Sequence, residues 1–102
     1  MIGKAIFNKS PFTPNKLAEL PLGAIKPSGW LLDQLKTQAE GLSGTLGKYW
    51  PYVNENSAWV GGSGDAWERA PYYLDGLMPL AWELDDEELK SKCKKYLNWI
   101  FL

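Results

Sequence analysis

Side chains that could bind a sugar gather around a glycine-rich stretch in the middle of the chain. Asp65, Glu68 and Asp75 are carboxylates, and Arg69 directly follows Glu68. Carboxylates accept hydrogen bonds from sugar hydroxyls, and a glycosidase needs two carboxyl groups about 5–10 Å apart around the scissile bond. Spacing along the chain does not establish that the three carboxylates converge. We therefore treat them as candidates for substrate contact and assign none a catalytic role.

Each of these charged residues also has a purely structural interpretation. Asp65 could cap a turn, and Glu68 could pair with Arg69 or stabilise the start of a helix. Asp75 falls within an apolar helical stretch, where an unpaired charge would be costly. We expect Asp75 either to have a buried partner or to face a polar cavity.

Aromatic side chains form the second group, with six tryptophans in 102 residues. Aromatic rings can stack on the C–H faces of sugars, although they more often pack in a core. Position in a predicted loop favours sugar contact for Trp59 and Trp67. Three tryptophans on predicted helices are expected to pack: Trp30, Trp82 and Trp99. The predicted substrate contacts are Trp59, Asp65, Trp67, Glu68, Arg69, Tyr72 and Asp75.

The sequence offers little for metal or nucleophile chemistry. It has no histidine and one cysteine, Cys93, which excludes an internal disulfide and a site made of several cysteines. Cys93 also falls on a helical core stripe. The glycines at 61, 62 and 64 do not form a phosphate loop, because no Lys-Ser/Thr pair follows them. We predict no catalytic residue, metal ligand or cofactor in this chain.

Charge and hydropathy exclude two further classes of partner. The formal net charge is −1 and no basic patch persists, so nucleic acid is not an expected partner. No run of about 18 apolar residues predicts a membrane span. Residues 1–14 lack the apolar stretch of a signal peptide, which predicts a cytoplasmic location.

The elements that must position these residues begin after a proline-rich lead-in, residues 1–27. Its four prolines prevent a helix, and residues 20–25 could form a short strand or a docking segment. Ser28 is a good N-cap for an amphipathic helix with Leu31, Leu35, Ala39 and Leu42 on one face. That helix ends among the glycines of residues 41–47. Residues 48–67 read as a long irregular segment, which is typical of a functional loop.

Two more helices follow the irregular segment. The first has Pro71 in its first turn, runs to about Leu84 and is apolar nearly all round, with Pro79 expected to kink it. Acidic residues 85–88 suit the start of the second. Its apolar stripe is Leu89, Cys93, Tyr96, Leu97 and Ile100, and its lysines at 90, 92, 94 and 95 are expected to face water. The short turn predicts antiparallel packing.

A helix that is apolar all round needs neighbours on every side. Its two companions cannot supply them, so we expect further helices from a longer protein or from copies of this chain. An amphipathic helix alternating with an apolar one is the pattern that a closed ring of helical hairpins requires. We therefore predict an all-α fold: residues 28–102 form the first helical hairpins of an α/α barrel, truncated here.

Two stretches resemble the beta-L-arabinofuranosidase-like glycoside hydrolases, family 127 and relatives. WVGGSGDAWERAPYYLDGL, residues 59–77, is similar to an early segment of that family, and LGAIKPSGWL, residues 22–31, to its opening segment. The resemblance covers roughly residues 20–101. It implies an α/α six-hairpin barrel, of which this chain supplies the first hairpin and part of the second.

The resemblance also implies a chemistry that this chain does not contain. Family members use a cysteine nucleophile held in a zinc site and a glutamate acid/base, all far downstream, so zinc belongs to full-length relatives. We therefore predict an N-terminal fragment of a hydrolase of arabinofuranosyl or related plant-type glycans, inactive alone. Its expected partners are carbohydrate and either the rest of the barrel or another copy. The alternative is a self-sufficient helical module that binds carbohydrate or protein.

Overall fold

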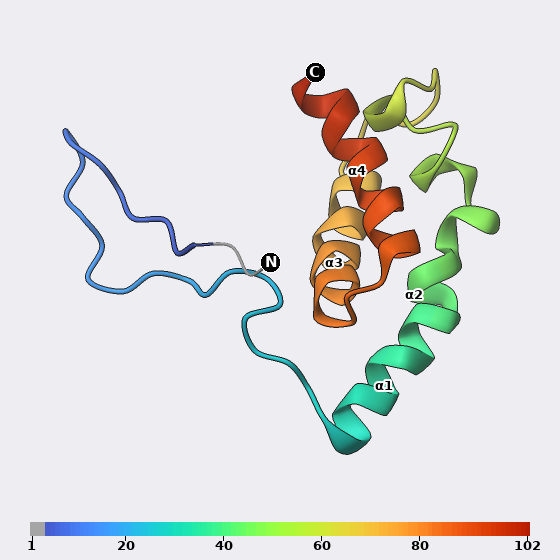
Figure 1. Cartoon of the computed structure of the whole chain (residues 1–102). Coiled ribbons are helices and arrows are strands. Elements are labelled where there is room, and N and C mark those ends of the chain that lie inside the picture. The colour runs from blue at the N-terminus through green and yellow to red at the C-terminus, as the bar shows by residue number, and fades with distance from the viewer. Residues whose placement is uncertain (1–3) are drawn as a thin grey trace.

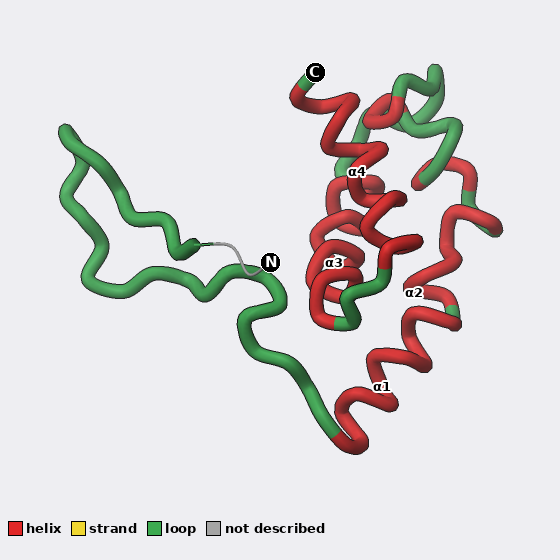
Figure 2. Tube along the Cα trace, viewed as in Figure 1, coloured by secondary structure: helices red, strands yellow, loops and turns green. Residues whose placement is uncertain are grey.

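The computed structural model describes residues 4–102, and its regular structure is entirely helical. The prediction of an all-α fold is confirmed: no strand occurs between residues 4 and 102 (Figure 2). The first three residues of the predicted lead-in lie outside this range. None of the described helices is long and apolar enough to cross a bilayer. The helices are α1 (Gly29–Glu40), α2 (Leu42–Thr45), α3 (Arg69–Glu83) and α4 (Glu87–Phe101).

An antiparallel pair, α3 and α4, forms the centre of the molecule (Figure 1). The predicted bounds and the predicted antiparallel packing are both confirmed. One face of each helix is apolar, and burying these faces against each other is the main favourable term for a small domain. The buried core consists of Ala70, Leu74, Leu77, Leu80 and Ala81 from α3 and Leu89, Cys93 and Tyr96 from α4.

The turn between α3 and α4 is formed and capped by acidic residues. Asp85 has a positive φ of 56°, in the left-handed region that reverses the chain within three residues. Asp86 then caps α4, because its Oδ1 accepts a hydrogen bond of 2.9 Å from the Leu89 N–H. Glu87 and Glu88 occupy the first turn, where the helix dipole favours negative charge.

Only one face of α3 is covered by residues 4–102, so the described helices do not supply the neighbours expected on every side of it. The opposite face carries Tyr72, Asp75, Gly76 and Pro79, and all four are exposed. Two of them are small and one is charged, so this face tolerates water.

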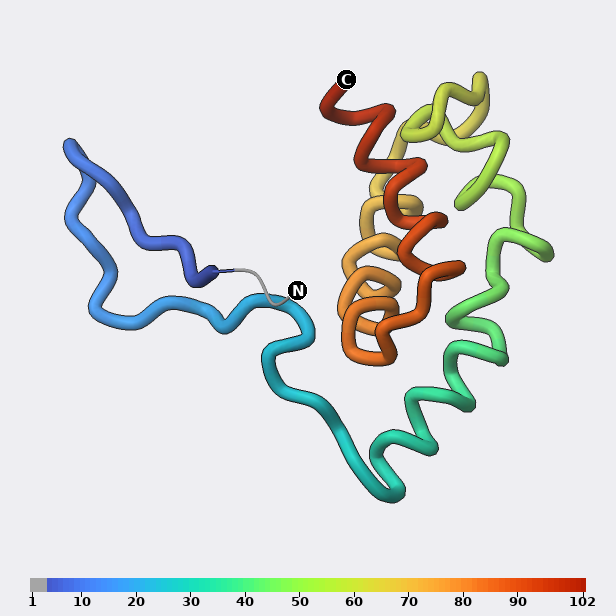
Figure 3. Tube along the Cα trace, in the orientation of Figure 1, coloured from blue at the N-terminus to red at the C-terminus, as the bar shows by residue number. Residues whose placement is uncertain are grey.

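Helix α1 differs from its prediction in two respects. Ser28 occupies the N-cap position, but its side chain makes no capping hydrogen bond. None of the residues of α1 is buried, and Trp30 is 72% exposed, which corrects the prediction that this ring packs. The reason is geometric, because α1 runs away from α3 and touches it at few points (Figure 3). The predicted end is confirmed: Gly41 closes α1, and Leu42 begins α2.

Three 3₁₀ turns precede α3: η1 (Leu46–Lys48), η2 (Pro51–Val53) and η3 (Ala58–Val60). They lie in the segment predicted to be irregular, and between residues 48 and 68 no α-helix or strand forms. Pro51 at the start of η2 suits the fixed φ of proline. The segment folds over the end of the α3–α4 pair where α3 begins and α4 ends (Figure 1).

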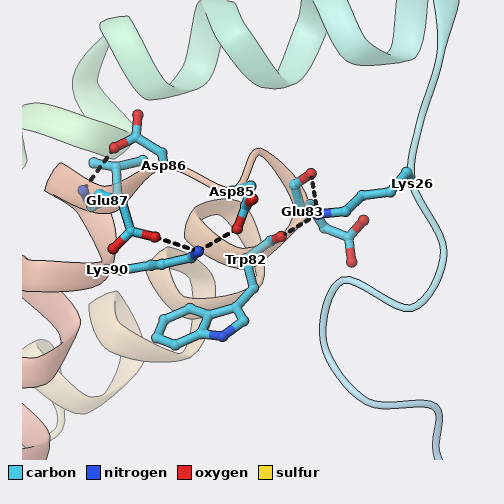
Figure 4. A network of polar contacts seen from close by, with 8 residues as sticks. Lys26, Trp82, Glu83, Asp85, Asp86, Glu87 and Lys90 are labelled. Atoms are coloured by element: carbon cyan, nitrogen blue, oxygen red, sulfur yellow. Dashed lines mark hydrogen bonds and ion pairs between the residues drawn. The ribbon is translucent and has the colours of Figure 1, made fainter. Parts of the chain in front are cut away.

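The lead-in is attached to the other end of α3, where Lys26 meets the C-terminus of that helix (Figure 4). Lys26 Nζ donates to the carbonyl oxygens of Trp82 at 2.6 Å and Glu83 at 3.0 Å. Carbonyls at a helix C-terminus lack partners within the helix, and a cation there also favours the helix dipole. The Gly23 N–H adds a hydrogen bond of 3.0 Å to Glu83 Oε1. No strand forms in residues 20–25; the Gly23 backbone attaches this segment to α3, whereas the apolar side chains considered for docking, at positions 20, 22 and 25, are exposed.

Lys90 lies in the same network and corrects the prediction that it faces water. Its side chain is buried, and its ammonium pairs with the carboxylates of Asp85 and Glu87. The hydrogen bond from Lys90 lowers the pKa of Asp85, and the two carboxylates together raise the pKa of Lys90. The ammonium also lies 5.8 Å from the centre of the Trp82 ring. Lys90 therefore ties the turn to both helices.

We predict that replacing Lys26 with methionine releases the lead-in. The variant keeps the aliphatic stem and loses two charge-assisted hydrogen bonds, each exposed, so the docked state should weaken by about 1 kcal/mol, roughly a fivefold change in population. Limited chymotrypsin digestion, scored at the Leu22–Gly23 bond, measures this. Lys16→Met is the control, since Lys16 is exposed. Equal cleavage rates in both variants would show that Lys26 does not hold the segment.

Candidate functional site

The glycine-rich stretch forms a tight turn that folds back on residues 55–57. Gly61 has a φ of 87°, which favours glycine. The Gly62 N–H donates to the Ser57 carbonyl oxygen at 2.8 Å, and the Gly64 N–H donates to the Asn56 carbonyl oxygen at 3.0 Å. The turn is therefore held by its own backbone.

The absence of side chains at these glycines serves close packing within the chain. A Cβ atom at Gly62 would lie 2.4 Å from the Glu55 carbonyl oxygen, and one at Gly64 would lie 2.4 Å from the Asn56 carbonyl oxygen. Real Cβ atoms do not come so close to backbone. From the sequence, glycines in this stretch are compatible either with a tight turn or with the close approach of a ligand to the backbone. The space beside these two glycines is filled by protein.

Asp65 and Arg69 are brought together by the start of α3. Their side chains form an ion pair, with 3.3 Å between Asp65 Oδ1 and an Arg69 guanidinium nitrogen. One structural interpretation paired Arg69 with Glu68. The structure pairs Arg69 with Asp65 instead. The guanidinium carbon also lies 5.6 Å from the centre of the Trp50 ring and 5.8 Å from that of Tyr52, within cation–π range.

The Asp65 carboxylate is nearly enclosed by the loop. Its side chain is only 8% exposed, and the oxygen that does not face Arg69 has no hydrogen-bond partner among residues 4–102. An oxygen covered in this way does not reach a ligand at the surface. The geometry therefore favours a structural role for Asp65, fixing Arg69 against the aromatic rings.

The two loop tryptophans have different environments. Trp59 packs against the core, and its ring N–H donates to the carbonyl oxygens of Ala66 at 3.2 Å and Trp67 at 2.9 Å. Trp67 is 71% exposed, so its ring is open to a ligand. Trp99, predicted to pack, is more than half exposed, although its ring edge lies against Gly61.

Two open grooves flank α3, and predicted residues line both. The first, about 340 Å³, lies between α1–α2 and α3. Tyr72 stands at it with the polar side chains of Gln38 and Ser43, above an apolar floor that includes Leu77 and Leu80. We call it the Tyr72 groove.

The second groove, about 250 Å³, lies between α3 and the end of α4, and Trp59 and Asp75 both line it. Its other lining residues are apolar apart from the Tyr96 hydroxyl: Pro71, Leu74, Met78, Tyr96 and Ile100. Asp75 is exposed there, which corrects the expectation of a buried partner or a polar cavity. Its place on the uncovered face of α3 lets water solvate the charge.

The seven predicted residues are therefore divided among several places. Asp65 and Arg69 touch each other, Trp59 and Asp75 share the second groove, and Tyr72 lines the first. Glu68 is exposed at the N-cap of α3, where its side chain makes no capping hydrogen bond. Neither groove is lined by a pair of carboxylates.

Burial sets the protonation of the groups in the core. Desolvation raises the pKa of the Cys93 thiol to about 11 and that of the Tyr96 hydroxyl to about 12. The thiol is therefore almost wholly protonated at neutral pH, which makes it a poor nucleophile. The Tyr96 hydroxyl donates a hydrogen bond to the Val53 carbonyl oxygen and so attaches η2 to α4. No cluster of three potential metal ligands occurs among the residues that the structure describes.

Several residues at these sites were not singled out from the sequence. Gln38 and Ser43 line the Tyr72 groove, but each reads as an ordinary polar residue on or beside an amphipathic helix. Tyr52 joins the Arg69 cluster, and the aromatic residues on either side of Pro51 were the available signal. Comparisons with protein families, curated proteins and solved structures found no match to this chain.

We predict that Gly62→Ala destabilises the loop, because the new Cβ must displace backbone at Glu55. Overpacking of this kind costs about 1–3 kcal/mol, or roughly 5–15 °C in the melting temperature of a domain this size. Gly76→Ala is the matched control, since a Cβ there meets nothing within 4 Å and alanine favours the helix. Thermal unfolding followed by circular dichroism compares them. A Gly62→Ala protein that melts with the wild type would refute the packing argument.

Proposed function

We propose that this chain supplies the first helices of an α/α-barrel glycoside hydrolase and contacts carbohydrate through the Tyr72 groove. The resemblance of residues 59–77 and 22–31 to the arabinofuranosidase-like family suggests arabinofuranosyl or related plant-type glycans as the ligand. The groove is the observation that carries the proposal. Its volume of about 340 Å³ lies within the usual range of small-molecule sites.

The lining of the groove suits the two kinds of surface that a sugar presents. The exposed Tyr72 ring can stack against the C–H face of a sugar ring. The Gln38 amide and the Ser43 hydroxyl can each donate and accept hydrogen bonds with sugar hydroxyls. Tyr73 donates a hydrogen bond of 2.9 Å to the Ser43 carbonyl oxygen and so steadies this wall. A few polar groups beside an apolar floor is the composition typical of a ligand site.

The proposed role is binding rather than bond cleavage. None of the residues lining the Tyr72 groove is a carboxylate. Asp65 is tied to Arg69, and Asp75 lies in the other groove. The resemblance implies a cysteine nucleophile and a glutamate acid/base that lie far downstream in family members, so the catalytic groups would come from the rest of the enzyme. A cytoplasmic location is retained as part of this proposal.

Uncovered apolar side chains support the participation of further protein. Trp30 and Leu31 on α1 are exposed, as are Trp99 and Phe101 on α4. In a ring of helical hairpins each helix has neighbours on both sides, which would cover such side chains. We propose that the rest of the barrel covers them in the enzyme and that a second copy does so for the isolated chain.

We predict that Tyr72→Ala weakens binding of an arabinofuranosyl oligosaccharide about tenfold, because the stacking surface is lost. Tryptophan fluorescence or NMR titration of the purified chain measures the dissociation constant. Tyr49→Ala is a closely matched control: Tyr49 is 74% exposed and Tyr72 is 73% exposed, but Tyr49 does not line the groove. Equal weakening by both substitutions, or no binding by the wild type, would count against the groove.

We also predict that the isolated chain self-associates, since its apolar surfaces lack the rest of the barrel. Sedimentation velocity over a range of concentrations should show a rising mean mass. Trp30→Ser should reduce the association if the face of α1 takes part. A monomer at all concentrations that also melts cooperatively would favour the alternative function, a self-sufficient helical carbohydrate-binding module.

A further inference from the structure

A separate pocket lies between α2–η1, η2 and α4. Its volume is about 100 Å³, and Tyr73 is the one residue it shares with the Tyr72 groove. Val53, Tyr73 and Tyr96 supply apolar wall. Three lysines from two parts of the chain also line it: Lys48, Lys92 and Lys95. Nothing in the proposed carbohydrate function uses this pocket.

The lysines give the pocket a surplus of positive charge. Lys92 and Lys95 are three residues apart on α4, so their side chains are neighbours on the helix surface and repel each other. Lys48 adds a third lysine to the lining, from η1. Glu88 pairs with Lys92 at 2.9 Å, but it is largely exposed, and no carboxylate is among the lining residues. An anion in the pocket would relieve this repulsion.

The hydrogen-bonding groups of the pocket are mainly donors. Lys92 Nζ donates to the Gly44 carbonyl oxygen at 3.1 Å, which holds the ammonium at the wall. Lys95 Nζ lies 3.5 Å from Asn54 Oδ1, at the limit of a hydrogen bond. Each ammonium has three donors, so both lysines keep N–H groups available to a ligand.

The polar groups of the walls, by contrast, are occupied within the chain. Tyr73 donates to the Ser43 carbonyl oxygen and Tyr96 donates to that of Val53. Thr45 Oγ1 donates to the Gly41 carbonyl oxygen at 2.7 Å. The hydroxyl protons are therefore used within the chain, and the charged donors left for a ligand are the lysine ammonium groups. Several ammonium donors above apolar wall recognise an oxyanion.

We propose that this pocket binds a compact oxyanion, a phosphate or carboxylate group carried by a small molecule. Its volume suits one such group with little else, and the larger Tyr72 groove does not contribute to it beyond Tyr73. The bound anion connects α4 to η1 through Lys92, Lys95 and Lys48, so binding stabilises the fold. The proposal is independent of the carbohydrate function.

Thermal unfolding of the whole chain in inorganic phosphate tests this, with sodium chloride at matched ionic strength as the reference. Phosphate also stabilises proteins by exclusion from their surface, so the comparison is made between variants. We expect phosphate to raise the melting temperature of the wild type by several degrees. Lys95→Gln should weaken phosphate binding about tenfold, whereas Lys94→Gln, an exposed lysine outside the pocket, should leave it unchanged.

Calorimetric titration of the same three proteins with phosphate and with acetate gives the affinities directly and separates the two sources of the oxyanion. Tighter binding of either one, lost in Lys95→Gln and kept in Lys94→Gln, supports the pocket and names its preferred group. Equal losses in both variants would mean diffuse attraction to surface charge. That result, or a phosphate effect no larger than that of chloride, would overturn the proposal.

Discussion

The apolar seam between α3 and α4 is the interaction on which the rest of this structure depends. Nearly all of the buried apolar side chains belong to these two helices. The lead-in, α2 and η2 are attached to this pair by polar side chains that reach a backbone carbonyl, whereas Trp59 of η3 packs directly against the core. Tyr96 holds η2 at Val53, Tyr73 holds α2 at Ser43, and Lys26 of the lead-in holds the end of α3. The hairpin is the framework, and the other segments are fastened to it.

This arrangement also explains where the molecule can bind ligands. Segments that are held at a few points leave spaces between those points. The Tyr72 groove lies where α1 and α2 approach α3 without covering it, and the lysine-lined pocket lies where η1 and η2 meet α4. Tyr73 borders both spaces. The hydrogen bond from the Tyr73 hydroxyl to α2 therefore fixes a wall that the groove and the pocket share.

The central hairpin could be predicted from the sequence because its signals are local. Apolar periodicity marks both helices, and Asp86 with the acids after it marks the start of α4. The burial of Lys90 could not be predicted, since a lysine among acids reads as solvated. The burial of Lys90 depends on the left-handed backbone conformation of Asp85, which places the Asp85 carboxylate next to the Lys90 ammonium.

The predicted site was harder to obtain for a related reason. Composition identified the loop as aromatic and glycine-rich, and the pairing of Asp65 with Arg69 follows from their spacing of four residues. Which groups would share a groove depends on how far α1 lies from α3. No pattern within α1 encodes that distance, because its apolar face, with Leu31 exposed, is left largely uncovered.

The polar fastenings join parts of the chain that are far apart in sequence. Tyr73 bonds to a residue 30 positions earlier and Tyr96 to one 43 positions earlier. Lys26 bonds to a residue 56 positions later. The entropy of closing such loops grows slowly, by about 0.6 kcal/mol for each doubling of length, so distance along the chain barely ranks them. All of them end on the same hairpin. Fraying of that hairpin would release them at once, so we expect the lead-in, the loop and the first helices to unfold as one cooperative unit.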